Sequence, residues 1–182
     1  MSIRQYRPRS NRRQGISANQ SLGLYLLLAF AIALQISYPL VNGDALRYIT
    51  IFTVITGAIL MLTHSFLSYG FRYFATFGAV TFGFALIVEI IGSKTGWPFG
   101  SYVYDDSLGL KIAGVPIIVP FAWIMMAHPV LIAARKTIPS WAFIYGGAGL
   151  MVWDLFLDPQ MVAANRWTWD VVGTHVPFQP EI

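Results

Sequence analysis

The sequence predicts an all-α membrane protein, a polytopic bundle of about five transmembrane helices with a long outer loop between helices three and four. Of its 182 residues, 56% are hydrophobic and only 11% are charged, far below the quarter that is usual in soluble domains. Five apolar runs are each about long enough to cross roughly 30 Å of hydrocarbon. The chain contains no cysteine, which excludes disulfides, thiolate catalysis and cysteine metal sites.

Residues 1–20 are predicted to be a basic cytoplasmic segment, and residues 21–182 an integral membrane domain. The segment carries five arginines and no acid. The apolar run that follows, 22–41, is too long for the core of a signal peptide and ends without a small-residue cleavage site, so it is predicted to be the first membrane helix. The arginines lack the interleaved aromatics of a nucleic-acid patch, and we expect no nucleic-acid partner.

Four further membrane helices are predicted, at 48–67, 73–92, 115–134 and 141–157. Asn42-Gly43-Asp44 has the composition of a tight turn between the first two. Pro159 disfavours helical geometry at the residue before it, so the fifth helix is predicted to end at Asp158. The segment after Asp158 is polar and aromatic and is not predicted to span.

The basic residues predict the orientation. With the N-terminus inside, eight of the twelve lysines and arginines fall on the cytoplasmic side and four on the outer side, as the positive-inside rule expects. The predicted location is the plasma membrane, with a cytoplasmic N-terminus. All eight acidic residues fall on the outer side or at the outer helix ends. An outer polar site would explain this; chance placement in longer outer loops is the alternative.

Glu89 is the first candidate catalytic residue. It lies three residues before the predicted end of the third helix, roughly 5 Å inside it, where an ionisable group is costly unless paired or hydrated. In an apolar surrounding the neutral acid is favoured, so Glu89 could donate a proton. The alternative is a glutamate that reaches the headgroup region and pairs with Lys94 or Lys111.

Asp154 and Asp158 are the other two candidates. Their spacing of four residues places both carboxyl groups on one helix face. Such a pair could act as a general base, bind a divalent metal ion, or share a proton. A solvated helix end is the alternative. The histidines are expected to lie apart from the acids, and we predict no metal site.

The loop between helices three and four combines turn residues with aromatics. Gly96 to Gly100 is a turn by composition, and Asp105 and Asp106 are predicted to be solvated turn acids. Tyr102-Val103-Tyr104 alternates as a strand would, which favours a short hairpin with 108–112. The aromatic residues of the outer side fit an interfacial belt, and they could equally line a lipid-accessible pocket and stabilise a cation.

These residues resemble those of the carotenoid biosynthesis membrane proteins of the carotenoid 1,2-hydratase type. The resemblance covers roughly 89–177 and is carried by Glu89, Gly92, Thr95-Gly96-x-Pro98-Phe99-Gly100-x-Tyr102-x-Tyr104, Leu108-Gly109, Gly114-Val115-Pro116, Pro120, Trp123, Asp154-x-x-x-Asp158-Pro159 and Trp167-x-Trp169. It implies further membrane helix after Val176-Pro177, so we expect this stretch to lack the family's C-terminal helix or helices. Asn165-Arg166 stands where a glycine would be expected.

The resemblance implies the addition of water to the terminal double bond of an acyclic (ψ) carotenoid end, giving a tertiary alcohol. We expect Glu89 to be the acid and Asp154 or Asp158 the base, with no cofactor. The residues expected to contact substrate are Thr95, Phe99, Tyr102, Tyr104, Trp123, Trp167 and Trp169. The expected partners are a lipid-soluble polyene and membrane lipid; the sequence leaves the oligomeric state open.

Two other functions stay open. The Asp154-x-x-x-Asp158 spacing is also that of a diphosphate–metal motif in magnesium-dependent prenyl-transferring membrane enzymes, although a second aspartate-rich helix is missing. The other is a non-catalytic carotenoid-binding membrane protein.

Overall fold

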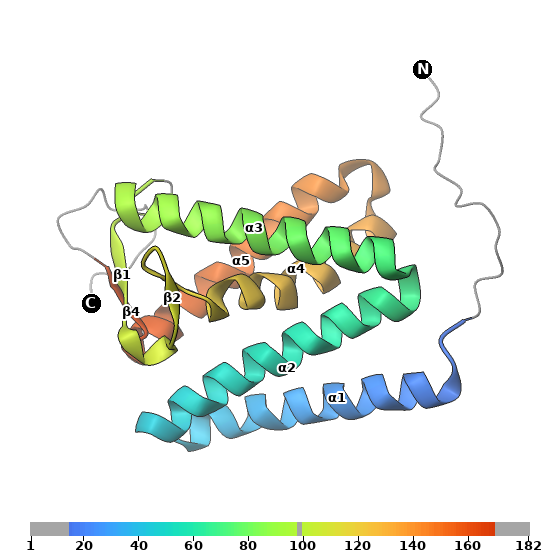
Figure 1. Ribbon diagram of the computed structural model, residues 1–182, viewed down its shortest axis with the longest axis horizontal. Coiled ribbons are helices and arrows are strands. Elements are labelled where there is room, and N and C mark those ends of the chain that lie inside the picture. Colours follow the sequence, from blue (N-terminus) through green and yellow to red (C-terminus); the bar gives the residue numbers. More distant parts are fainter. Residues whose placement is uncertain (1–14, 98–99, 170–182) are drawn as a thin grey trace.

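Five long helices make up most of the computed structural model, which describes residues 15–97 and 100–169 (Figure 1). They are α1 (Ala18–Ser37), α2 (Gly43–Tyr69), α3 (Phe71–Thr95), α4 (Ile118–Thr137) and α5 (Ala142–Ala163). Each is long and apolar enough to cross a membrane. The predicted all-α, multi-pass architecture is therefore confirmed, while the sidedness drawn from the basic residues stays a prediction.

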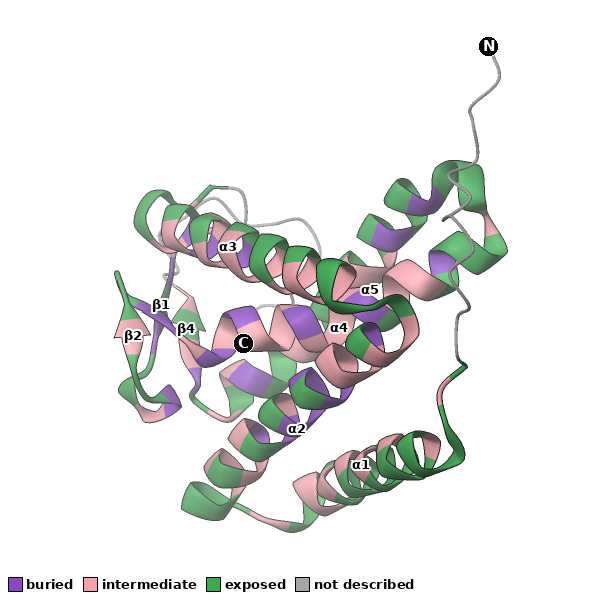
Figure 2. Ribbon diagram, turned by 45° about the vertical axis from the view of Figure 1, so that its right-hand side comes forward, coloured by how far each residue is buried: buried purple, intermediate pink, exposed green. Residues whose placement is uncertain are grey.

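The centre of the bundle is the packing of α4 against α2 and α3. Gly57 of α2 permits the close approach, because a Cβ atom there would lie 2.4 Å from Sδ of Met125 on α4. The peripheral helix α1 packs on α2 and has no buried residue, and α5 packs on α4 (Figure 2). Apolar side chains that face outward from these helices suit a lipid surrounding.

Four short strands lie at one end of the bundle, here called the loop end. The strands are β1 (Tyr102–Tyr104), β2 (Lys111–Ile112), β3 (Val115–Pro116) and β4 (Trp167–Trp169). β1 pairs antiparallel with β4, which is more than sixty residues away in the chain, and β2 pairs with β3. The predicted hairpin of Tyr102–Tyr104 with 108–112 is therefore wrong, since the strand finds its partner after α5. Three-residue 3₁₀ turns complete the connections: Tyr38–Leu40, Asp106–Leu108 and Pro139–Trp141.

Several helix boundaries differ from the prediction, among them the end of α3, which lies at Thr95 rather than at residue 92. α2 begins at Gly43 rather than near residue 48, because Asn42 is extended and the acidic Asp44 suits the first turn of a helix. α4 begins at Ile118, since Val115–Pro116 forms β3. α5 does not end at Asp158 but continues to Ala163.

Pro159 is tolerated inside α5 because it lies in the last turns of the helix. A proline there removes only the one backbone hydrogen bond to the Leu155 carbonyl, and α5 continues to Ala163. The longer helices place the acids deeper than predicted. Glu89 lies six residues before the end of α3, about 9 Å, and Asp154 nine residues before the end of α5, about 14 Å.

Candidate functional site

Glu89 is the centre of a buried hydrogen-bond cluster at the loop end. Its side chain on α3 is 7% exposed. Oε2 accepts hydrogen bonds from the hydroxyls of Tyr102 (2.6 Å) and Tyr104 (2.8 Å). Oε1 accepts a third, of 3.1 Å, from the indole Nε1–H of Trp123 on α4. The carboxyl group thus joins α3, the loop and α4, and every recorded contact is donated to it.

The two tyrosines reach Glu89 because β1 alternates. Residues two apart in a strand point to the same face, and both Tyr102 and Tyr104 are buried whereas Val103 is exposed. Opposite them on β4 stand Trp169 and Trp167, each in register with one tyrosine. The ring centroids of Tyr102 and Trp169 are 5.0 Å apart and those of Tyr104 and Trp167 are 5.6 Å apart. The paired strands therefore form an aromatic cover over the carboxyl group.

Both tyrosine hydroxyls keep their protons at this position. Burial raises the pKa of Tyr102 and of Tyr104 well above the ordinary value of 10, and the neighbouring Glu89 raises each further. A phenol that remains neutral is a hydrogen-bond donor. The tyrosines are therefore permanent donors to Glu89 over the physiological pH range.

Asp154 and Asp158 lie on α5, which packs on α4 and contacts β4. The side chain of Asp154 is exposed and that of Asp158 is half-buried. Both are near enough to Glu89 for its charge to act on them, and Trp167 lies beside Asp158. Because α5 continues as a helix through Asp158, the two aspartates stay on one face as predicted. The three predicted carboxyl groups thus share the loop end.

The predicted substrate-contacting residues divide into two groups. Tyr102, Tyr104, Trp123, Trp167 and Trp169 surround Glu89 or cover it. Thr95 does not join them: its hydroxyl bonds the carbonyl of Ile91 (2.7 Å) and accepts from the Trp97 amide, at the end of α3. Phe99 lies outside the described residues.

The loop lysines and acids form a separate group. Lys111 Nζ lies 2.6 Å from Oδ1 of Asp106 and donates to the Tyr104 carbonyl, so it is not a partner of Glu89. Asp105 caps the 3₁₀ turn through the Ser107 amide, and its hydrogen bonds with Ser107 lower its pKa. Asp105 and Asp106 are exposed, as predicted for turn acids.

Two surface hollows lie elsewhere. One, of about 460 Å³, is at the loop end and includes Arg47 and Arg166; the other, of about 360 Å³, lies between α2 and α3 and includes Leu62 and Phe74. Neither includes Glu89, Asp154 or Asp158, so the predicted polyene pocket beside the acids stays a proposal. Across the described part of the chain, no three histidine or acidic side chains gather as metal ligands would.

The sequence reasoning missed a histidine pair between α2 and α4. His64 Nδ1 lies 3.0 Å from His128 Nε2, and the Ser68 hydroxyl lies 3.2 Å from His64 Nε2. The rings of Tyr69, Tyr73 and Phe77 surround His128. Both histidines were expected to lie apart from the acids, but nothing in the sequence indicates that the second and fourth helices are in contact.

Comparison with known proteins agrees with the resemblance. The family model described as carotenoid biosynthesis protein matches residues 49–179. A bisanhydrobacterioruberin hydratase of Haloarcula japonica is 31% identical over 100 residues, which cover 50% of this chain and 34% of that protein. The chain thus spans about a third of the length of this relative. No solved structure matches.

Proposed function

The chain belongs to the carotenoid biosynthesis protein family, and from this membership we propose that it hydrates the terminal double bond of an acyclic carotenoid end. The observation that carries the proposal is the buried Glu89 carboxyl group, held by three donors under an aromatic cover whose strand β4 contacts α5, the helix of Asp154 and Asp158. The hydratase name of the Haloarcula relative supports the reaction class. A fixed carboxylate, two further acids and aromatic rings are what such a reaction needs.

Glu89 is proposed to stabilise the cation rather than to donate the proton. The sequence suggested Glu89 as the acid, but its three contacts are all donated to it, and an ionised carboxylate is a pure acceptor. Held in place, it provides a preorganised negative charge toward a tertiary carbocation. The rings of Trp167 and Trp169 add cation–π attraction.

Asp154 and Asp158 are proposed to supply the acid and the base. Repulsion among three nearby carboxyl groups is relieved when one of them carries a proton. That proton adds to the less substituted alkene carbon, and the π electron pair forms the new C–H bond. Water then attacks the tertiary cation, and its spare proton passes to an aspartate carboxylate, so the net change is the addition of one water.

The proposal is tested in a cellular host that makes lycopene or another ψ-end carotene. Expression of the chain should yield a product heavier by one water. Glu89→Gln should lower that product on the order of 100-fold, because the fixed charge is lost. Asp154→Asn and Asp158→Asn should each lower it by a similar factor. Asp106→Asn, which removes an exposed acid of the same loop, is the matched control and should leave product unchanged.

Three results would reject the proposal. Equal amounts of hydrated product from Glu89→Gln and wild type would show that the Glu89 carboxylate takes no part in the reaction. Absence of hydrated product, together with an activity that disappears with a chelator and returns with magnesium, would indicate the prenyl-transferring alternative. Carotene that co-purifies unaltered with correctly inserted protein would indicate a carotenoid-binding protein without catalysis.

A further inference from the structure

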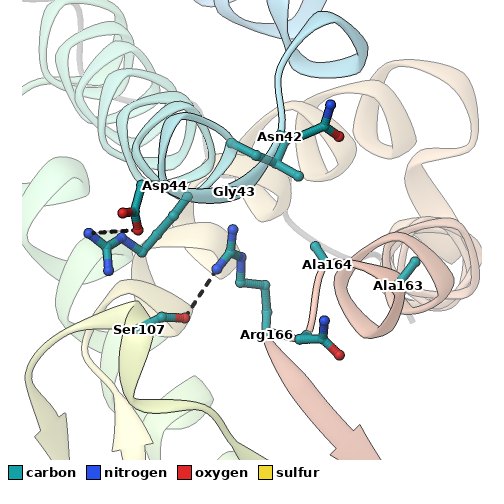
Figure 3. Close-up of a pocket in the computed structure, with 10 residues that line it drawn as sticks. Asn42, Gly43, Asp44, Ser107, Ala163, Ala164 and Arg166 are labelled. Atoms are coloured by element: carbon teal, nitrogen blue, oxygen red, sulfur yellow. Dashed lines mark hydrogen bonds and ion pairs between the residues drawn. The ribbon is translucent and has the colours of Figure 1, made fainter.

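The hollow of about 460 Å³ at the loop end is formed by three segments that are distant in sequence (Figure 3). They are the start of α2, the 3₁₀ turn containing Ser107, and the turn between α5 and β4. In Figure 3 the Arg166 side chain extends from the last of these toward Ser107 and the start of α2. The hollow contains none of the residues assigned above to hydration.

Arg166 is a buried cation with unused hydrogen-bonding capacity. The residue is 6% exposed, and its Nη1 donates to the Ser107 hydroxyl at 3.1 Å. Its Nε is buried without a hydrogen-bond partner, and no ion pair to Arg166 exists within residues 15–97 and 100–169. Burying a guanidinium without an anion is costly, so the site is incomplete as it stands.

A second arginine lines the same hollow. Arg47 pairs with Asp44 at 3.3 Å and lies over the Tyr48 ring at 4.7 Å. The Asp44 side chain is 81% exposed, so water screens much of its charge. Two arginines against one carboxylate leave the hollow with one positive charge.

The start of α2 adds backbone donors. α2 is 27 residues long, and the side chain of its N-cap residue Asn42 makes no capping hydrogen bond. The first amide groups of a helix point outward along its axis and carry the positive end of its dipole, which favours anions. Asn42, Gly43 and Asp44 all line the hollow, so these donors and the two arginines converge on it.

We propose that this hollow binds a phosphate group. Guanidinium groups and helix N-termini are the donors that phosphate oxygens prefer. The hollow lies at the ends of two membrane-spanning helices, where headgroup phosphates lie beside the hydrocarbon core. A phospholipid headgroup and free phosphate share this chemistry. The phosphate would also brace β4, because Arg166 immediately precedes that strand and its carbonyl accepts from the Asp105 amide at 2.9 Å.

The test measures lipid retention by the purified full chain. The protein is exchanged into mixed micelles of phosphatidylglycerol and a phosphate-free glycolipid with the same tails, and bound lipid is counted by native mass spectrometry. Wild type should retain phosphatidylglycerol over the glycolipid. Arg47→Gln and Arg166→Gln should each weaken retention about tenfold, since each removes a charge-assisted contact. Lys94→Gln, which removes an exposed cation outside the hollow, is the matched control and should retain the lipid as wild type does.

Two further variants separate binding from support of the fold. Asp44→Asn removes the only carboxylate among the described residues that line the hollow, and it should strengthen lipid retention. A purely structural role for the ion pair of Asp44 with Arg47 predicts loss of stability alone. Arg166→Lys keeps the charge and should restore part of the retention lost in Arg166→Gln. Arg47 pairs with Asp44, whereas Ser107 is hydrogen-bonded by Arg166. The result for Arg47→Gln therefore holds even where Arg166→Gln destabilises the turn before β4.

A parallel titration with inorganic phosphate identifies the source. Phosphate that competes with phosphatidylglycerol indicates a lipid headgroup site. Phosphate that raises the melting temperature through Arg47 and Arg166, with lipid retention equal in all variants, indicates a free-phosphate site. Retention and melting temperature that respond to neither arginine would overturn the proposal. None of these readouts depends on hydratase activity.

Discussion

Two polar clusters hold α4 against its neighbours, and they differ in charge and in completeness. At the loop end, Trp123 of α4 donates to Glu89 of α3, and both Glu89 oxygens have partners. Further along α4, His128 meets His64 of α2. The His128 residue is 1% exposed, but its Nδ1 has no hydrogen-bond partner in the described structure.

The differences between the Glu89 cluster and the histidine pair distinguish a candidate functional site from a contact that only supports the fold. A carboxylate is expensive to bury, and the cluster around Glu89 draws donors from a loop and two helices to satisfy it. A neutral imidazole pair tolerates one missing bond at a far smaller cost. The Glu89 cluster is also adjacent to two further acids, whereas the histidine pair is surrounded by aromatic rings. We therefore expect the two clusters to respond differently to substitution.

Glu89→Ala should give the largest loss of stability. The change leaves two hydroxyls and one indole N–H without an acceptor, and buried orphaned donors cost about 1–3 kcal/mol each. A total loss of about 3 kcal/mol or more in the free energy of unfolding is expected, measured by reversible denaturation in mixed micelles. Glu89→Gln keeps one acceptor oxygen and should lose less. An unfolding free energy for Glu89→Ala within about 0.5 kcal/mol of wild type would contradict the arrangement.

Tyr104→Phe should have an intermediate effect. It removes a 2.8 Å hydrogen bond to a carboxylate, a kind of bond worth about 1.5–3 kcal/mol. Loss of this size should appear in the same denaturation experiment, together with reduced hydrated product. Tyr145→Phe on the exposed face of α5 is the matched control. An equal loss of unfolding free energy in that variant would show that the buried Tyr104 hydroxyl contributes no more than an exposed one.

His128→Phe should have a smaller effect. The phenyl ring is larger than the imidazole but keeps the contacts with the surrounding aromatic rings. The substitution removes the unpartnered Nδ1, and only one neutral hydrogen bond is lost, worth about 1 kcal/mol. Hydrated product from an acyclic carotene should be unchanged. If product fell as far as in Glu89→Gln, the histidine pair would belong to the reaction and the contrast between the clusters would fail.

The sequence could predict the helices because each apolar run is long enough on its own. Their ends were less predictable. Asn42-Gly43-Asp44 has the composition of a turn, although Asn42 as N-cap and an acid in the first turn also favour the start of a helix there. Pro159 predicts the end of the fifth helix at the preceding residue. A proline removes only one backbone hydrogen bond, however, and α5 continues past it. Local rules cannot weigh that cost against the packing of a whole helix.

The candidate site shows the same limit at longer range. The residue types around Glu89 were predictable, since a buried acid and an alternating aromatic strand are visible locally. The pairing of β1 with β4 was not, because alternation predicts a strand but not its partner. The contact of α2 with α4, which brings His64 to His128, joins elements that are not consecutive in the chain. The orientation of donors toward Glu89, which changes its proposed role, appears only in three dimensions.

The smallest effect expected concerns pH, and it tests the Glu89 cluster without any change in sequence. The pKa of Tyr102 and Tyr104 is raised by burial and by Glu89, so both should stay protonated when the exposed tyrosines ionise near pH 10. The raised values stabilise the fold below the unfolded pKa of about 10, and that contribution is lost as the pH rises above it. Tyrosinate absorbance should therefore report Tyr102 and Tyr104 only on unfolding. Tyr102→Phe and Tyr104→Phe should each remove one of this late-ionising pair, and a titration in which both ionise with the exposed residues would place their hydroxyls in water rather than on Glu89.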